Sequence, residues 1–288
     1  MTKPLSSVNL HQLVQQVITE QRHSSILCAP KVIQEGVYDP GILKAVFTAG
    51  GPGSGKSYLA DVVFGVRTAK DKPFFENASF IGSNGLKYVN SDRFFERELG
   101  KLGINPKDLR DIADLPSDEL WDIVQSADEP ESARNVAKGY LESLRNLYEK
   151  GRLGMLIDGT GGKYDKMVRE KSLADAMGYD TYMLFVDTSL PVAIERDAKR
   201  DRTLGPKLVE EIWQNVQDNK ERFKELFGDN FAVVENSVYG PPPQEVIKSL
   251  NNFVESPVEN PLGQAWIQGE LEKKKRSEEH TSELQSPC

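Results

Sequence analysis

The feature that most constrains this chain is a glycine-rich loop between an apolar run and an amphipathic pattern. Residues 44–65 read KAVFTAGGPGSGKSYLADVVFG and contain Gly50-Gly51-Pro52-Gly53-Ser54-Gly55-Lys56-Ser57, which fits the pattern G-x-x-x-x-G-K-[ST]. The apolar run predicts a strand, and the residues after the loop predict a helix. In this context such a loop holds the phosphates of a nucleotide. A glycine-rich turn without a ligand is the alternative that the residues leave open.

The residue types of this loop suit phosphate binding. Glycine permits backbone turns with positive φ, which bring successive N–H groups to phosphate oxygens. The start of the following helix adds partial positive charge. Lys56 is expected to reach the β- and γ-phosphates, and Ser57 to ligate Mg²⁺. We therefore predict that residues 50–57 and Tyr58 bind ATP together with Mg²⁺.

Composition and charge exclude several other classes of protein. The chain has 288 residues, of which 38% are hydrophobic and 28% charged, as in ordinary globular proteins. No apolar run approaches the roughly 20 residues of a membrane helix, and the first residues lack the apolar core of a signal peptide, so we expect a cytoplasmic protein. A net charge of −8 disfavours binding to nucleic acid through a general positive field. Histidines occur only at positions 11, 23 and 280 and cysteines at 28 and 288, which excludes a central catalytic histidine and a disulfide framework.

Apolar runs and helical patterns alternate along the chain. Strands are expected at residues 43–48, 86–90, 154–158, 181–187 and 231–235. Helices are expected at residues 56–64, 92–102, 133–150, 165–177, 191–200, 206–227 and 243–254. Such alternation predicts a three-layer α/β/α fold around a parallel five-stranded sheet. The strand order expected for the nucleotide-kinase type of this fold is 2-3-1-4-5.

Four regions are expected along the chain. Residues 1–40 form an N-terminal helical extension, and residues 41–256 form the main domain, with a helical insertion at about residues 101–131. Residues 257–275 are a proline-punctuated appendage with one short helix. The stretch RSEEHTSELQS, residues 276–286, resembles the translation of a sequencing-library adapter, so we interpret residues 276–288 as an artefactual tail.

Two classes of enzyme that use this loop fit the rest of the sequence poorly. A GTPase needs an Asn-Lys-x-Asp motif to read guanine, and the nearest candidate, Asn219-Lys220-Glu221-Arg222, ends in arginine within a helical pattern. A motor of the AAA type would place acidic residues together at the end of a long apolar strand, whereas Asp158 is followed by glycine. A small kinase is the class that remains.

Residues 40–240 resemble the zeta-toxin family of kinases in the order and spacing of their motifs. The resemblance is carried by LKYVNSDRFFERELG after the second strand, by LGMLIDGTGGKYDKMVREKSLADAMGYDTYMLFVDTS across the third and fourth, and by AIERDAKRDR after them. Chains of this type from bacteriophage genomes also look similar. The resemblance implies an ATP-dependent transfer of phosphate to a hydroxyl group.

Asp92 is the candidate catalytic carboxylate. It follows the second predicted strand in VNSD, so it is expected at the carboxyl edge of the sheet, where ligands bind. There it would accept the proton of a substrate hydroxyl or orient that hydroxyl for attack on the γ-phosphate. The alternative is that Asp92 caps the next helix.

Asp158 and Thr160 end the third predicted strand, beside the glycine-rich loop if the strand order is 2-3-1-4-5. Asp158 would hold Mg²⁺ through water or contact the substrate, and Thr160 would hydrogen-bond to either. A structural turn is the alternative reading. Zeta toxins carry arginine after the acidic-Gly-Thr-Gly run, whereas this chain has Gly162 followed by Lys163, which puts the family's sugar-nucleotide substrate in doubt. Lys163 is kept as a candidate substrate-binding residue.

A basic cluster follows the fourth predicted strand and consists of Arg196, Lys199, Arg200 and Arg202. The first three share one face of a predicted helix, and Arg202 lies in a loop suited to a lid. Guanidinium groups over the nucleotide would neutralise charge on the transferred phosphoryl group, so Arg196 and Arg202 are the candidate catalytic arginines. A solvated helix face is the alternative, because acidic residues interleave with these.

The sequence thus predicts a kinase that moves the γ-phosphate of ATP to a hydroxyl of a small molecule or a nucleic acid. Within kinases, the alternative is phosphorylation of a polynucleotide end or of a modified base. From another class, the alternative is an ATP-binding or ATPase module that transfers no phosphate. Such a module would have no use for Asp92 facing the γ-phosphate.

Overall fold

The computed structural model describes residues 36–64, 84–104, 130–200, 203–238 and 240–284. The expected N-terminal extension and the expected helical insertion therefore fall almost wholly outside the described residues, as does Arg202. The described part begins with a short 3₁₀ turn, η2 (Gly36–Tyr38), that leads into the sheet.

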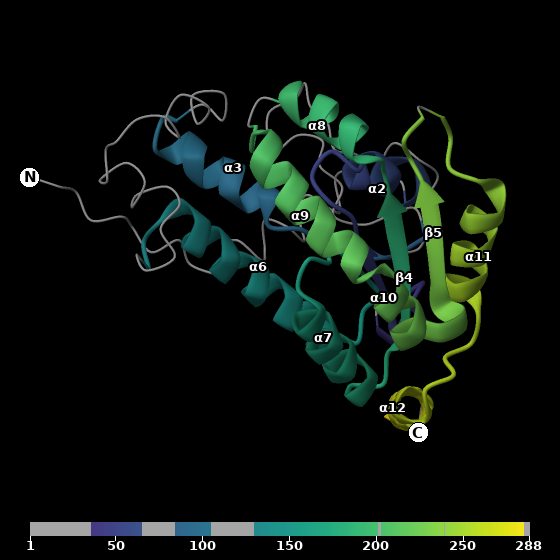
Figure 1. Cartoon of the computed structure of the whole chain (residues 1–288). Helices are drawn as coiled ribbons and strands as arrows, with labels where there is room; N and C mark the ends of the chain where they lie inside the picture. The colour runs from purple at the N-terminus through teal and green to yellow at the C-terminus, as the bar shows by residue number, and fades with distance from the viewer. Residues whose placement is uncertain (1–35, 65–83, 105–129, 201–202, 239, 285–288) are drawn as a thin grey trace, which may run out of the picture.

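Five parallel strands form the centre of the molecule (Figure 1). They are β1 (Lys44–Ala49), β2 (Lys87–Val89), β3 (Met155–Ile157), β4 (Asp180–Asp187) and β5 (Phe231–Glu235). Their order is β2-β3-β1-β4-β5, and every neighbouring pair is parallel. The predicted strand order is therefore confirmed, and each strand lies within two residues of its predicted position.

The sheet is buried on both faces, as a parallel sheet requires. Along β1, Ala45 and Phe47 face one hydrophobic cluster while Val46 faces another, because successive side chains of a strand point to opposite sides. Burying one large apolar side chain such as Phe47 contributes about 1.5–3 kcal/mol. The strands read as nearly continuous apolar runs for this reason.

Helices cover the two faces and complete three layers (Figure 1). One face is covered by α2 (Lys56–Phe64) and α11 (Gln244–Glu255). The other is covered mainly by α6 (Ala133–Lys150), α7 (Tyr164–Ala176), α9 (Pro206–Asp218) and α10 (Lys220–Phe227). Two further helices follow β2 and β4, namely α3 (Asp92–Lys101), which packs on α6, and α8 (Leu190–Ala198). The predicted three-layer fold is confirmed.

The single helix predicted at residues 206–227 is wrong, because the structure breaks it into α9 and α10 at Asn219. Asn219 is buried, and its side-chain amide donates a 3.0 Å hydrogen bond to the carbonyl oxygen of Gly161. A tertiary contact therefore accompanies the break in a segment whose apolar spacing favours a single helix. The predicted helix at residues 191–200 ends earlier, at Ala198.

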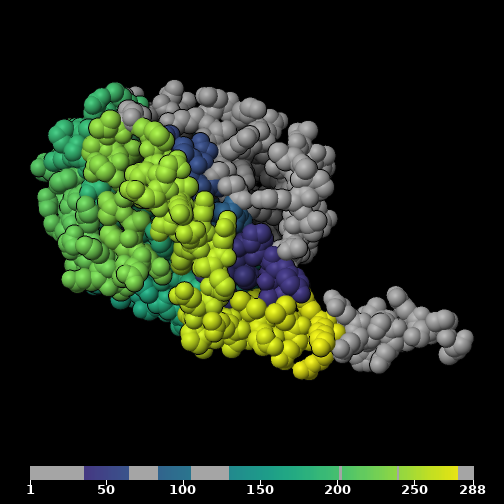
Figure 2. Space-filling model, turned by 90° about the vertical axis from the view of Figure 1, so that its right-hand side faces the viewer, coloured from purple at the N-terminus to yellow at the C-terminus, as the bar shows by residue number. Residues whose placement is uncertain are grey.

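The appendage after residue 257 contains a long helix rather than the short one predicted. This helix, α12 (Pro261–Leu284), has 24 residues and runs into the segment that resembles an adapter. Trp266 and Ile267 pack against the core of the domain. Lys274 Nζ lies 4.4 Å from the centre of the Tyr38 ring, and Figure 2 shows this yellow helix beside the purple start of the described chain.

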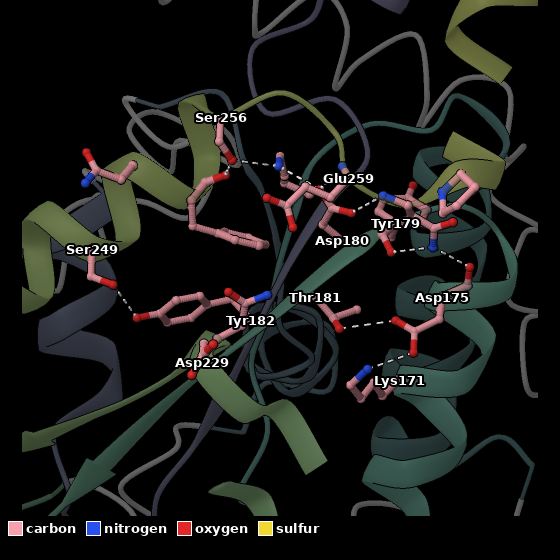
Figure 3. A pocket seen from close by; sticks show the side chains of 16 residues that line it. Lys171, Asp175, Tyr179, Asp180, Thr181, Tyr182, Asp229, Ser249, Ser256 and Glu259 are labelled. Atoms are coloured by element: carbon pink, nitrogen blue, oxygen red, sulfur yellow. Dashed lines mark hydrogen bonds and ion pairs between the residues drawn. The ribbon is translucent and has the colours of Figure 1, made fainter. Parts of the chain in front are cut away.

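A hollow of about 610 Å³ opens at the amino ends of β1 and β4 (Figure 3). Here Lys44 forms a buried ion pair of 2.8 Å with Asp180 and donates a 3.1 Å hydrogen bond to Ser256. The backbone N–H of Asn260 also donates to Asp180, over 2.8 Å. These bonds fasten residues 256–260 to the sheet at the edge opposite the glycine-rich loop.

Among the described residues, no helix has the length and apolar character that crossing a membrane requires.

Candidate active site

A row of polar or glycine residues lies along the carboxyl edge of the sheet. Each follows the last residue of its strand, and in spatial order they are Asn90, Asp158, Gly50, Thr188 and Asn236. In open parallel sheets, ligands bind outside this edge. The glycine-rich loop between β1 and α2 sits at the middle of the row, so the predicted placement of the loop is confirmed.

The loop requires glycine at two of its positions. Gly53 and Gly55 have φ values of 71° and 89°, which other residues rarely adopt. A Cβ on Gly53 would lie 2.4 Å from the carbonyl oxygen of Ala193, and a Cβ on Gly55 would lie 2.2 Å from Nδ2 of Asn236. The backbone can take this path only because no side chain is present there.

Ser54 is the point at which the loop is anchored to the neighbouring strands. Its carbonyl oxygen accepts a 2.6 Å hydrogen bond from Asn236 Nδ2 and a 3.4 Å bond from Thr188 Oγ1. Its own hydroxyl is buried and has no hydrogen-bond partner. A buried hydroxyl without a partner is costly, and a phosphate oxygen is the kind of acceptor that would satisfy it. The loop therefore fits a phosphate group.

Lys56 begins α2 and turns back over the loop. Its Nζ donates hydrogen bonds to the carbonyl oxygens of Gly50 and, over 3.3 Å, of Gly51. Burial lowers the pKa of Lys56, the nearby charge of Asp158 opposes that shift, and the charge of Arg200 adds to it. Lys56 is thus a desolvated cation that lies within electrostatic reach of the candidate carboxylates.

Asp158 is held by side chains from both neighbouring strands. Thr48 Oγ1 donates a 2.8 Å hydrogen bond to Oδ1, while Asn90 Nδ2, at 2.5 Å, and the Tyr88 hydroxyl, at 3.2 Å, donate to Oδ2. A carboxylate has about four acceptor positions, so three are used within the protein. The arrangement leaves room for one further contact, such as a water of a hydrated cation.

Asp92 is the first residue of α3 and is exposed. The cap position belongs to Ser91, and the side chain that binds the backbone N–H of Asp92, over 2.6 Å, is that of Asn90. Asp92 acts on Lys56 by charge and counteracts part of the lowering of its pKa. The carboxylate is therefore near the loop and does not serve as the helix cap.

The remaining candidates in the loop and after β3 lie at the same edge but are open to solvent. Ser57 and Tyr58 are exposed, and the Tyr58 hydroxyl donates a 3.4 Å hydrogen bond to the carbonyl oxygen of Gly240. Thr160 and Lys163 are also exposed. The backbone of Thr160 is nevertheless tied to the loop, because its carbonyl oxygen accepts a 2.9 Å bond from the N–H of Gly50.

The basic cluster is divided by the structure. Arg196 Nη1 donates a 3.3 Å hydrogen bond to the carbonyl oxygen of Gly53, so this guanidinium reaches the loop. Lys199 follows the end of α8 and pairs with Glu195 on the surface. Arg200 is exposed and affects the pKa of Lys56 by charge alone. The predicted shared helix face of residues 196, 199 and 200 is therefore wrong, because the helix ends before the last two.

Sequence reasoning missed the residues that support the site. They are Thr48, Tyr88, Asn90, Thr188, Asn219 and Asn236. A usable signal was present, since Thr188 and Asn236 are small polar residues directly after a predicted strand, and Thr48 and Asn90 are the last residues of two others. Tyr88 and Asn219 carry no such signal, because an aromatic residue in a strand and an asparagine in a helical pattern are common.

The residues present are compatible with Mg²⁺ bound together with a nucleotide. Mg²⁺ in such sites takes one or two protein ligands and keeps several waters. Ser57 and Asp158 are the residues that would hold it. Within the described ranges, no group of three or more His, Cys, Asp or Glu side chains is placed to hold a metal ion.

No family model matches this chain, and no curated protein matches it by sequence. Among solved structures, it is similar to one from the PezAT chromosomal toxin–antitoxin system of Streptococcus pneumoniae, with 15% identity and a TM-score of 0.46 over 93% of this chain and 98% of the other. It is also similar to a gluconokinase from Sinorhizobium meliloti, with 12% identity and a TM-score of 0.39 over 76% and 95% of the two chains. A third similar structure is a shikimate kinase from Acinetobacter baumannii in complex with shikimate. The identity is 13% and the TM-score 0.35, over 74% of this chain and 93% of the other. The fold assignment rests on the strand order and the loop of this chain itself.

Proposed function

We propose that the chain is an ATP-dependent phosphotransferase that moves the γ-phosphate of ATP to a hydroxyl of a small molecule or a nucleic acid. The observation that carries the proposal is the shared sheet edge of three groups: the glycine-rich loop with Lys56, the carboxylate of Asp158 and the carboxylate of Asp92. A loop for phosphate next to an exposed carboxylate provides for both the donor and the acceptor of a phosphoryl group.

The residues of the site have separate tasks in this proposal. Backbone N–H groups of residues 53 and 55–57 and the hydroxyl of Ser54 bind the phosphates, and Lys56 leaves the loop carbonyls to reach them. Asp92 takes the proton of the acceptor hydroxyl. The oxygen of that hydroxyl then bonds to the γ-phosphorus, while the bond between this phosphorus and the bridging oxygen of ADP breaks. Ser57 and Asp158 would hold Mg²⁺, which would supply positive charge at the phosphate oxygens.

Arg196 adds charge from the side of α8 in this scheme. Its hydrogen bond to Gly53 supports a position beside the loop. Arg202, which lies outside the described residues, would join it from the segment that follows. The sequence likeness of residues 40–240 to the zeta-toxin kinases supports a transferring enzyme of this kind, while Gly162 leaves the acceptor open.

A non-transferring ATP-binding or ATPase module is the second candidate. The observation that favours it is the exposure of Ser57 at the end of the loop, where the γ-phosphate would be open to water. The exposed carboxylate of Asp92 would be idle in a passive binder, so transfer is the first choice.

The test is a transfer assay with ATP labelled at the γ-phosphate. Nucleotide sugars, nucleosides, and single- and double-stranded DNA and RNA are offered as acceptors in the presence of Mg²⁺. We expect ADP and labelled acceptor to form in equal amounts. The Lys56→Ala variant should form neither. Labelled inorganic phosphate without any labelled acceptor would identify an ATPase, and absence of ADP under every condition would contradict a phosphotransferase. Lys273→Ala, which removes an exposed lysine of α12, is the matched control and should keep full activity.

A further inference from the structure

A single side-chain amide joins the carboxylate of Asp158 to the backbone of Asp92. Asn90 follows β2, and its Oδ1 accepts a 2.6 Å hydrogen bond from the backbone N–H of Asp92. Its Nδ2 donates a 2.5 Å bond to Oδ2 of Asp158. The same nitrogen donates over 2.9 Å to the hydroxyl oxygen of Tyr88. All the hydrogen-bonding groups of this side chain are therefore engaged.

The partners permit only one orientation of the amide. If Asn90 were turned over, its oxygen would face the carboxylate of Asp158 and its NH₂ group would face the N–H of Asp92. Both contacts would then be repulsive, because acceptor would meet acceptor and donor would meet donor. The two partners thus fix the amide, and the amide fixes the distance between the β2 and β3 strand ends.

Tyr88 reinforces this arrangement as a permanent donor. Burial raises the pKa of the Tyr88 hydroxyl, and the charge of Asp158 raises it further. The hydroxyl therefore keeps its proton and can donate to Asp158 while accepting from Asn90. Thr48 holds the other carboxylate oxygen from β1.

We propose that Asn90 is a positioning residue, whose amide holds the carboxylate of Asp158 through Nδ2 and the start of α3, with Asp92, through Oδ1. The proposal rests on the proposed function, because it places Asp92 and Asp158 for phosphoryl transfer. It adds a residue that acts on the reaction through the carboxylate of Asp158 and through the backbone of Asp92.

The competing role is purely structural, in which Asn90 is only a cap for α3. Asn90→Asp separates the two roles, because aspartate keeps the acceptor for the N–H of Asp92 and loses the donor to Asp158. Two carboxylates so close together share one proton. At low pH the shared proton restores a donor between them, and at high pH the two charges repel. A cap alone gains nothing from low pH.

The first measurement is the thermal midpoint Tm at about pH 5.5 and about pH 8, which requires no acceptor. Relative to wild type, Asn90→Asp is expected to lower Tm by about 4–8 °C at the higher pH and by less at the lower pH. The exchanged pair Asn90→Asp with Asp158→Asn restores one carboxylate and one amide, so it should recover at least half of that loss. Ser132→Ala removes the cap of α6, where Ser132 Oγ accepts a 3.3 Å bond from the N–H of Asn135, and should lower Tm equally at both pH values.

The second measurement is kcat and KM for ATP in the transfer assay. Asn90→Asp should lower kcat between about tenfold and about 100-fold at pH 8, with KM for ATP nearly unchanged, and the loss should shrink at lower pH. A Tm equal to that of wild type at both pH values, or a loss of Tm that the exchanged pair leaves uncorrected, would overturn the pairing of Asn90 with Asp158. An unchanged kcat would overturn its positioning role. If wild type transfers nothing to any acceptor, the phosphotransferase proposal and the positioning role fail, while the Tm result still decides the pairing.

Discussion

Arg196 reaches from α8 to the glycine-rich loop, where its Nη1 donates a 3.3 Å hydrogen bond to the carbonyl oxygen of Gly53. Ala193, one turn earlier on the same helix, packs against Gly53 so closely that no Cβ fits between them. The helix after β4 therefore both supports the loop and carries a guanidinium beside it. The hydrogen bond to Gly53 thus links Arg196, one residue of the predicted basic cluster, to the glycine-rich loop.

We expect Arg196→Ala to lower phosphoryl transfer by about 10² to 10³-fold with little change in ATP affinity, because its charge acts mainly on the transferred group. Arg196→Lys should recover part of the rate, since it keeps the charge and loses the planar fork. Arg169→Ala, an exposed arginine on α7, is the matched control and should behave as wild type. Full activity of Arg196→Ala would leave its bond to Gly53 as a packing contact only.

The first prediction extends to Arg202, which lies outside the described residues and which the sequence places in a segment suited to a lid. Binding of nucleotide and acceptor together should protect residues 200–207 from hydrogen exchange more than nucleotide alone, because closure excludes water from the γ-phosphate. Arg202→Ala should then reduce transfer without weakening nucleotide binding. Equal protection with and without every acceptor, combined with full activity of this variant, would identify residues 200–207 as an ordinary surface segment.

The second prediction concerns the shape of the loop. Gly53→Ala is expected to lower ATP affinity at least tenfold and to lower Tm, because its Cβ would lie 2.4 Å from the carbonyl oxygen of Ala193 at a φ of 71°. Gly139→Ala is the matched control: Gly139 lies within α6 with no atom within 4 Å of a new Cβ, so this change should stabilise the protein by about 0.5–1 kcal/mol. Nucleotide titration and thermal unfolding of both variants are the measurements. A Gly53→Ala variant with wild-type affinity would show that the loop can move away from α8.

Most of the fold could be predicted from the sequence because it depends on local patterns. The apolar runs, the turn residues after them and the glycine-rich loop define strands and helices within a few residues. The break at Asn219 could not be predicted, because it depends on a bond to Gly161, 58 positions earlier in the chain. The long α12 was also missed, since the prolines before it suggested interruption, whereas Pro261 stands at its first position, where proline is tolerated.

The candidate site likewise contains some residues that could be predicted from the sequence and others that could not. Lys56 could be found from the motif of the glycine-rich loop, and Asp92 from its position just after a predicted strand. Both signals are visible in the sequence. The support of Asp158 is different, because Thr48 and Asn90 lie 110 and 68 positions away and meet it only through the strand order. A reader of the sequence who knew that order could have found them by comparing the residues that follow each strand. Tyr88 would still have been counted with the core.

The third prediction tests the candidate catalytic carboxylate. Asp92→Asn should lower turnover by about 10² to 10⁴-fold and leave ATP affinity nearly unchanged, because only the acceptor hydroxyl loses its partner. Asp92 is exposed and Ser91 holds the cap position, so the variant should fold normally. Glu96→Gln, one turn further along α3, is the control for loss of a negative charge from this helix. A joint fall of ATP affinity and turnover in Asp92→Asn would assign Asp92 to nucleotide binding instead of transfer.

The fourth prediction follows from the environment of Lys56. Burial lowers the pKa of its ammonium group when only the loop carbonyls of Gly50 and Gly51 contact it. Phosphate groups next to it would raise that pKa again, because they favour the charged form. A lysine that titrates at lower pH in the free protein than in the complex takes up a proton on binding. This uptake is absent at low pH, where Lys56 is charged in both states, and grows as the pH rises through the lowered pKa of the free protein.

We therefore expect ADP binding to become weaker, and to take up more protons, as the pH rises toward the ordinary lysine value of about 10.4. Isothermal calorimetry in two buffers of different ionisation enthalpy measures the protons directly, and ADP avoids turnover during the titration. Lys56→Met keeps the length of the side chain and removes the charge, so its ADP affinity should be lower and free of the pH-dependent uptake. Equal proton uptake by wild type and Lys56→Met at the higher pH would show that another group titrates, and that Lys56 stays with the loop carbonyls when nucleotide binds.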